Sequence, residues 1–230
     1  MRIKLAAILT VVAGLALTGC SPSSSSSNEP AVSSTSSAPD AAVFAHPNIE
    51  GLEIEFAKQP ENIVMDCYAY STLNEYGFKP SAIFGYQCDD PTVMDGVDTT
   101  GIEQIGTDGE IDLEKLAQLK PDAIVGFGTA DGWQWFKEDV NAQLTRVAPF
   151  VPLPSGDTID EGIANVRELA DFLGADLGDT NITQADKDFE AAKKNFTEAV
   201  SEKELTFLLA NAKQEMLYTR AGGPQALLLE

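Results

Sequence analysis

The sequence has few of the residues that catalytic and metal centres need. It contains one histidine, His46, and three cysteines among 230 residues. A Ser-His-Asp apparatus therefore lacks its base, and no glycine-rich phosphate loop follows an expected strand. Sites that hold a bare transition metal usually recruit several histidines or cysteines. We expect a protein that is not an enzyme and that has no cofactor and no resident metal.

Basic residues are also scarce. The chain has 15 Lys and Arg against 36 Asp and Glu, so its formal net charge is -21 at pH 7. A chain this acidic repels phosphate backbones, which disfavours nucleic acid as a partner. It also repels anionic lipid, so we expect membrane attachment to come through a lipid anchor only.

The one long apolar run lies at the N-terminus. Arg2 and Lys4 precede the segment 5–17, which is too short for a retained membrane-spanning helix and suits the core of a signal peptide. The run ends in Leu-Thr-Gly-Cys at 17–20, which is typical of a lipobox. We expect residues 1–19 to be a signal peptide and Cys20 to be lipidated, on the extracytoplasmic face of the cell membrane. The alternative is an ordinary cleaved signal with an incidental Cys20.

Residues 20–43 are expected to form a tether. Beyond Cys20 this segment is mostly Ser, Pro and Ala, with almost no large apolar side chain to offset the entropy of ordering it. The remaining cysteines, Cys67 and Cys88, would belong to an exported chain, where disulfides persist. We expect these two to pair; a reactive thiol and a metal site are the competing interpretations.

Short apolar runs recur about every twenty residues after the tether. They occupy residues 63–65, 82–84, 102–105, 123–127 and 147–151. Helix signals lie between them: residues 71–76 end at Gly77, Asp112 caps a helix that Pro121 stops, and a longer helix begins near Ile159 and ends at Gly174. This alternation predicts an α/β fold, a Rossmann-like lobe over residues 44–180 with a mostly parallel sheet.

A longer helix is expected next. Residues 181–203 place Phe189, Phe196 and Val200 on one stripe, and Thr183 is the expected cap. Apolar runs at 205–209 and 216–218 then predict further strands. Residues 204–230 would be the start of a second α/β lobe.

Several segments of residues 58–230 resemble a known family, the substrate-binding lipoproteins of ABC importers for iron siderophores and cobalamin. The matching segments are residues 60–64, 77–80, 105–114, 119–125 and 218–224, in the family's order. The family has two lobes joined by one long rigid helix, which the segment 181–203 fits. A complete second lobe would need about a hundred more residues, so the resemblance implies a chain truncated in that lobe.

The resemblance implies capture of a ferric siderophore or similar iron complex, by a monomer that docks on an ABC permease. Cobalamin or haem is an alternative ligand. From another class, an exported enzyme or an adhesion module lacking its second half is the alternative. The family docks through an acidic residue in each lobe; here Ser71 occupies the first position, and Glu75 is the nearby substitute.

Ligands of open α/β sheets bind beyond the carboxyl ends of the strands, where this sequence is rich in aromatic residues. The candidate contacts are Tyr68, Tyr86 and Trp133, with Tyr218 and Arg220 in the second lobe. Trp135, Tyr70 and Gln87 are weaker candidates, and Thr129 also follows the fourth apolar run. Rings offer apolar faces to a bulky chelate, and their polar groups can orient its oxygens. Each ring could instead be packing, and Arg220 could be a solvated cation. Arg146 is expected on the surface or at a lobe-closing contact.

Overall fold

The computed structural model describes residues 41–201, 203, 209–213 and 216–220. The expected signal peptide, Cys20 and the tether up to residue 40 lie outside these residues, as does most of the segment 204–230. The centre of the fold is a five-stranded sheet in the order β11-β8-β3-β4-β5. Its strands are β3 (Ile63–Asp66), β4 (Ala82–Phe84), β5 (Glu103–Gln104), β8 (Ala123–Gly126) and β11 (Phe150–Pro152). Every pair in this sheet is parallel, so the α/β prediction is confirmed.

Alternate strand residues supply two separate cores. In β3, Ile63 and Met65 pack into one cluster, whereas Val64 packs into the other. Successive side chains of a strand point to opposite faces, and layers cover both faces of this sheet. The first cluster also receives α1 and α5, and the second receives α3 and α4. Continuous apolar runs in the sequence therefore mark strands that are buried on both sides.

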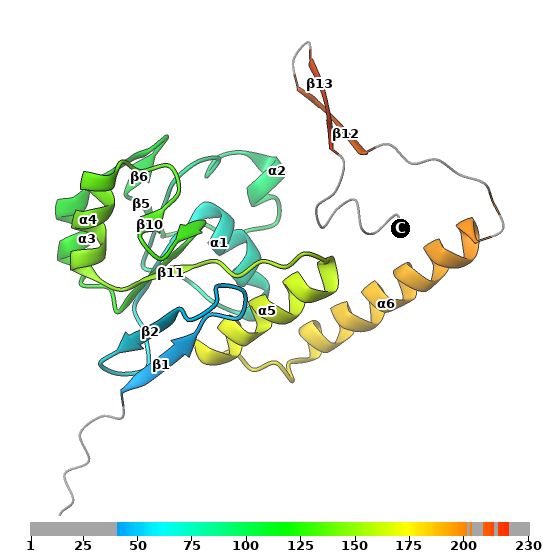
Figure 1. The fold of residues 1–230 in the computed structure, drawn as a ribbon, viewed down its shortest axis with the longest axis horizontal. Coiled ribbons are helices and arrows are strands. Elements are labelled where there is room, and N and C mark those ends of the chain that lie inside the picture. The colour runs from blue at the N-terminus through cyan, green and yellow to red at the C-terminus, as the bar shows by residue number, and fades with distance from the viewer. Residues whose placement is uncertain (1–40, 202, 204–208, 214–215, 221–230) are drawn as a thin grey trace, which may run out of the picture. The chain divides into compact units, whose positions relative to one another are not determined.

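Helices connect the strands (Figure 1). They are α1 (Cys67–Leu73) with the 3-10 turn η1 (Asn74–Tyr76), α2 (Pro91–Met94), α3 (Leu113–Leu119), α4 (Glu138–Val147) and α5 (Ile159–Phe172). Two short hairpins follow strands β5 and β8: β6 (Gly106–Thr107) with β7 (Glu110–Ile111), and β9 (Gly128–Thr129) with β10 (Gly132–Trp133). The Asp112 carboxylate accepts the Lys115 backbone N–H at 2.9 Å, so the expected cap of α3 is confirmed.

An N-terminal hairpin corrects the predicted end of the tether. Strand β1 (Ala42–Ala45) pairs antiparallel with β2 (Glu53–Phe56), so the folded lobe begins at Ala42 and not at residue 44. Phe44, Ile54 and Phe56 are buried in the first cluster. Strand β1 was not predicted, because it directly follows a Ser- and Ala-rich segment and is held in place by packing against the lobe.

His46 ties this hairpin to the sheet. Its Nε2 lies 3.1 Å from the Pro152 carbonyl oxygen of β11, and its side chain is buried. Within the described residues its Nδ1 has no hydrogen-bond partner. Burial lowers the pKa of His46 from its ordinary value of 6.5, outweighing the bond to Pro152. Above about pH 6.5 the folded protein therefore holds the neutral imidazole.

We expect the free energy of unfolding to fall as pH decreases below about 6.5. The unfolded chain then takes up a proton that the buried ring resists, so stability is fully present above that pH. The slope approaches at most about 1.4 kcal/mol per pH unit. Urea unfolding between about pH 7.5 and 5.5 measures it, and His46→Gln, which keeps a side-chain donor, removes it. An unchanged slope in that variant would contradict this assignment.

The segment before β11 also differs from prediction. The apolar residues at 147–151 were expected to form one strand, but Val147 is the last residue of α4 and the strand begins at Phe150. Helix α4 was not predicted from the sequence. Val140, Leu144 and Val147 follow helical spacing and pack into the second cluster. The short polar helix carries too few apolar residues to stand out beside the strand that follows it.

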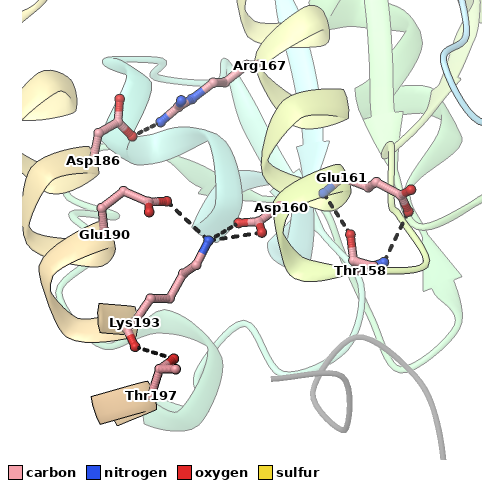
Figure 2. Close-up of polar contacts among 8 residues, drawn as sticks. All are labelled: Thr158, Asp160, Glu161, Arg167, Asp186, Glu190, Lys193 and Thr197. Carbon is pink, nitrogen blue, oxygen red and sulfur yellow. Dashed lines mark hydrogen bonds and ion pairs between the residues drawn. The ribbon is translucent and has the colours of Figure 1, made fainter. Parts of the chain in front are cut away.

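The long helix α6 spans Thr180–Val200, against the expected 181–203, and its cap is Asp179 rather than Thr183. Figure 2 shows how α6 is held against α5. Arg167 of α5 pairs with Asp186, and Lys193 of α6 reaches Asp160 at 3.0 Å. Thr158 and Glu161 form a capping box at the N-terminus of α5. The two ion pairs therefore join α6 to α5.

Beyond α6, strands β12 (Leu209–Lys213) and β13 (Met216–Arg220) pair antiparallel. The expected strand at 216–218 is therefore confirmed and extends to Arg220. The other expected strand, at 205–209, lies outside the described residues except for Leu209, where β12 begins. Tyr218 and Arg220 stand on β13, and their side chains lie outside the described part of the structure.

Candidate functional site

Asp66 lies at the carboxyl end of the central strand β3 and is fully buried. Its Oδ1 accepts the Ala69 backbone N–H at 2.6 Å, which caps α1. Its Oδ2 accepts both the Phe127 backbone N–H and the Trp133 indole N–H, each at 2.7 Å. Burial raises the pKa of Asp66, and these hydrogen bonds act against that rise. One carboxylate therefore joins the ends of β3 and β8 and the hairpin β9–β10.

Four rings form the surface above Asp66, which we name the aromatic face: Tyr68, Tyr86, Phe127 and Trp135. Trp135 stacks on Phe127 and on Tyr68, with ring centroids 5.5 and 6.0 Å apart, and meets Tyr86 edge-on at 5.4 Å. Phe127 and Trp135 keep 41% and 37% of their surface exposed. Exposed rings that cluster at the carboxyl ends of parallel strands are suited to bind an apolar or π-rich ligand.

Trp133 lies beneath this face, which corrects the expectation that it contacts ligand. Its side chain is fully buried, and its ring packs against Tyr86 and Trp135 at 5.6 and 4.9 Å. Gly85 makes room for it, since a Cβ there would stand 2.9 Å from the indole. Trp133 therefore supports the face from below. Its indole N–H donates to Asp66 in this structure, so this group is not available to a ligand.

Tyr68 and Gln87 form a polar edge to the face. The Tyr68 hydroxyl donates to Gln87 Oε1, and Gln87 Nε2 donates to Asp90 Oδ2 at 3.0 Å. Gln87 has φ +60°, in the left-handed region that residues other than glycine seldom occupy. Burial first, and then the charges of Asp66 and Asp90, raise the pKa of Tyr68. This hydroxyl therefore remains protonated at neutral pH.

The disulfide prediction is confirmed. Cys67 and Cys88 are bonded, with Cα atoms 5.3 Å apart. Cys67 opens α1 directly before Tyr68, and Cys88 directly follows Gln87. The bond therefore links the segment after β3 to the segment after β4, and each segment carries part of the site.

Other candidates lie away from the face. The Tyr70 side chain is buried, and its hydroxyl donates to the Asp98 carbonyl oxygen at 2.6 Å. Arg146 is exposed in the last turn of α4, which leads into the start of β11 rather than its end. Sequence reasoning missed Phe127 and Asp66. Both residues lie at the end of an apolar run, and the pattern of such a run predicts a strand rather than a site. A carboxylate directly after a buried strand, as at Asp66, could nevertheless have indicated a buried polar contact.

Two cavities border α5 and are separate from the face. One, of about 600 Å³, lies between α5 and α6, and the other, of about 510 Å³, reaches η1 and the loop after β11. Neither is lined by a residue of the aromatic face. No helix in the described part of the chain has the length and apolar character that crossing a membrane requires. The described residues also bring together no group of three or more His, Cys, Asp or Glu that could hold a metal ion.

Comparisons relate this arrangement to known proteins. The sequence model of the periplasmic binding protein family matches residues 88–228. The chain is similar to DesE, a ferric-siderophore receptor protein from Streptomyces coelicolor, at 26% identity with a TM-score of 0.65. That match covers 77% of this chain and 62% of DesE. The search of curated proteins finds no match.

Two further solved structures share the fold. YclQ, a petrobactin-binding protein from Bacillus subtilis, is 14% identical with a TM-score of 0.57, over 80% of this chain and 61% of YclQ. VctP, a periplasmic catecholate-siderophore binding protein from Vibrio cholerae, is 16% identical with a TM-score of 0.53, over 79% of this chain and 61% of VctP. The chain thus spans less than two thirds of the length of each of these relatives.

Proposed function

The chain belongs to the periplasmic binding protein family, a family of extracytoplasmic solute-binding proteins rather than enzymes, and on that premise we propose that it captures a ferric siderophore for an ABC importer. The aromatic face carries this proposal. Four clustered rings, two of them more than one-third exposed, offer a broad surface at the end of the sheet where ligands bind. The description of DesE, a relative at 26% identity, as a ferric-siderophore receptor supports the same ligand class.

The chelate would rest on Trp135 and Phe127, with the Tyr68 hydroxyl at its edge. Large rings contribute binding area at little conformational cost, because packing already holds them. Trp135 packs against the buried Trp133, and the Phe127 N–H donates a hydrogen bond to Asp66. Both contacts would hold the face in place before a ligand binds. Tyr218 and Arg220 remain predicted contacts from the second lobe.

Trp135→Ala is expected to weaken binding of a ferric chelate about 10- to 100-fold, since central aromatic contacts dominate such sites. Calorimetric titration of the purified chain measures this with ferric hydroxamates, a ferric catecholate, ferric citrate, haem and cobalamin. Phe196→Ala on α6 is the matched control, because Phe196 is 40% exposed and stands apart from the face. It should leave the affinity unchanged.

Saturable binding of haem or cobalamin alone would replace the proposed ligand. Binding of a ferric chelate that survives Trp135→Ala would move the site away from the aromatic face. A folded chain that binds none of these compounds would contradict the proposed function.

Anchoring through lipid on Cys20 is the second part of the proposal. The sequence Leu-Thr-Gly-Cys at 17–20 after an apolar segment supports it, and it would hold a highly acidic protein at the extracytoplasmic side of the cell membrane. Expression of Cys20→Ala followed by membrane fractionation tests it. Retention of this variant in the membrane fraction would argue against the lipid.

Docking on the permease would use Glu75 rather than Ser71. The Ser71 hydroxyl donates to the Tyr68 carbonyl oxygen at 3.0 Å and is half-buried, whereas Glu75 is exposed on η1. A carboxylate at that place can pair with a basic surface of the permease. Glu75→Lys should block uptake of the chelate while leaving its binding intact, and unchanged uptake would exclude this contact. A monomer is the predicted state.

A further inference from the structure

The segments that follow the sheet strands carry more acid than base. After the ends of β3, β4, β5, β8 and β11, the described residues 66–72, 85–90, 105–112, 127–137 and 153–158 contain Lys137 as their only Lys or Arg. Their acidic residues are Asp66, Asp89, Asp90, Asp108, Glu110, Asp112, Asp131 and Asp157. An incoming ligand therefore meets a negative potential at this end of the sheet.

Two of these acids are tied to the aromatic face by contacts. Asp90 accepts from Gln87, which accepts from the Tyr68 hydroxyl, so its charge stands two hydrogen bonds from a ring of the face. Asp66 lies directly beneath, bonded to the Phe127 N–H. Burial, and then the charges of Asp66 and Asp90, raise the pKa of Tyr68, in keeping with two acids close to this hydroxyl.

A third acid stands at the rim. Asp108 and Gly109 form the turn of the hairpin β6–β7, and a Cβ on Gly109 would lie 3.4 Å from the Tyr86 hydroxyl and 3.5 Å from the Trp135 carbonyl oxygen. The turn that carries Asp108 therefore borders the face. Exposed ring faces also attract cations through their quadrupoles.

Ferric chelates differ in charge in a way that this face can distinguish. A hydroxamate loses one proton when it binds iron and a catechol loses two. Three hydroxamates therefore give a neutral complex, to which an ammonium tail adds positive charge, whereas three catecholates leave three negative charges. Resting on the proposed function, we infer that the aromatic face selects ferric chelates without net negative charge, of the trihydroxamate type, over ferric tricatecholates.

A charge series on one iron core tests this inference. The probes are a linear ferric trihydroxamate with a terminal amine, its N-acetyl derivative and its N-succinyl derivative, which carry one positive charge, none and one negative charge. Calorimetry on the purified chain should give tightest binding for the amine and roughly tenfold weaker binding for the succinyl derivative at low salt. Salt at about 0.5 M should reduce this ratio by screening.

A pair of variants localises the effect. Asp90→Asn removes one charge and keeps an amide oxygen that can cap α2, where the Asp90 carboxylate now accepts the Thr92 N–H. It should reduce the ratio between amine and succinyl derivatives about two- to threefold. Asp171→Asn makes the same change of net charge on α5 and should leave the ratio unchanged.

The outcomes separate this inference from the proposed function. Tighter binding of the succinyl derivative or of a ferric tricatecholate would overturn the charge preference while leaving siderophore capture in place. Equal shifts in both Asn variants would assign the preference to overall charge and so overturn the role of the face. Absence of binding by every ferric chelate would overturn the proposed function and the inference together.

Discussion

Asp66→Ala is expected to lower the free energy of unfolding by about 2–4 kcal/mol. The buried donors on Ala69 and Trp133 and the part-buried N–H of Phe127 lose their acceptor, and each unsatisfied buried donor costs about 1–3 kcal/mol. Burial disfavours the charged form of Asp66 and raises its pKa, so removing this carboxylate also removes an unfavourable desolvation energy that offsets part of the loss. For a chain of this size the thermal midpoint should fall by roughly 5–15 °C.

The same variant should disturb the site. The Trp133 indole N–H loses its acceptor, and with it the hydrogen bond that holds this ring under Trp135. The near-ultraviolet circular dichroism of the aromatic residues should therefore weaken even if the chain remains folded. Asp171→Ala removes an exposed carboxylate from α5 and should change stability by less than about 0.5 kcal/mol. An Asp66→Ala protein with an unchanged midpoint and an unchanged aromatic signal would show that Asp66 does not organise this end of the sheet.

Removal of the Cys67–Cys88 bond by a double change to alanine is expected to cost about 3 kcal/mol. The two residues are 21 positions apart, and opening a loop of that length restores entropy to the unfolded chain. Alanine is chosen because both positions are buried, where a serine hydroxyl would need a partner. The bond also joins the segments of Tyr68 and Gln87, so affinity for a ferric chelate should fall about tenfold as these segments lose their fixed spacing.

Thermal unfolding and calorimetric titration of the double variant measure both effects. Cys20→Ala leaves the Cys67–Cys88 bond intact and should keep the thermal midpoint and the affinity of the parent chain. Addition of a thiol reductant to the parent chain should reproduce the double variant. A double variant that loses stability but keeps full affinity would limit the disulfide to a structural role.

The regular βα alternation was predictable because it depends on local chemistry. Parallel strands buried on both faces must be continuously apolar, which the runs at 63–65, 82–84 and 123–127 show directly. Gly77 ends η1 at φ +83° and Gly174 follows α5 at φ +93°, conformations that glycine adopts most easily. The capping carboxylate of Asp112 is equally local.

Errors arose where distant residues decide the structure. Strand β1 forms because Phe44 and β2 pack into the first core cluster, although the segment before the strand consists mostly of small and polar residues. Helix α6 is capped by Asp179 rather than Thr183, and either residue type is a good cap. The ion pairs that join α6 to α5 involve residues 19 and 33 positions apart, which no helical period relates.

The sequence by itself predicted the class of fold, favoured the pairing of Cys67 with Cys88, and showed the aromatic richness beyond the strands. These follow from composition and from patterns that repeat within a few residues. Only the tertiary structure decided which of these aromatic residues are exposed and which are buried. Trp133 and Trp135 are two positions apart and indistinguishable by type, yet the buried Asp66 holds Trp133 in the core while Trp135 is left at the surface. That choice depends on a carboxylate 67 residues away from Trp133.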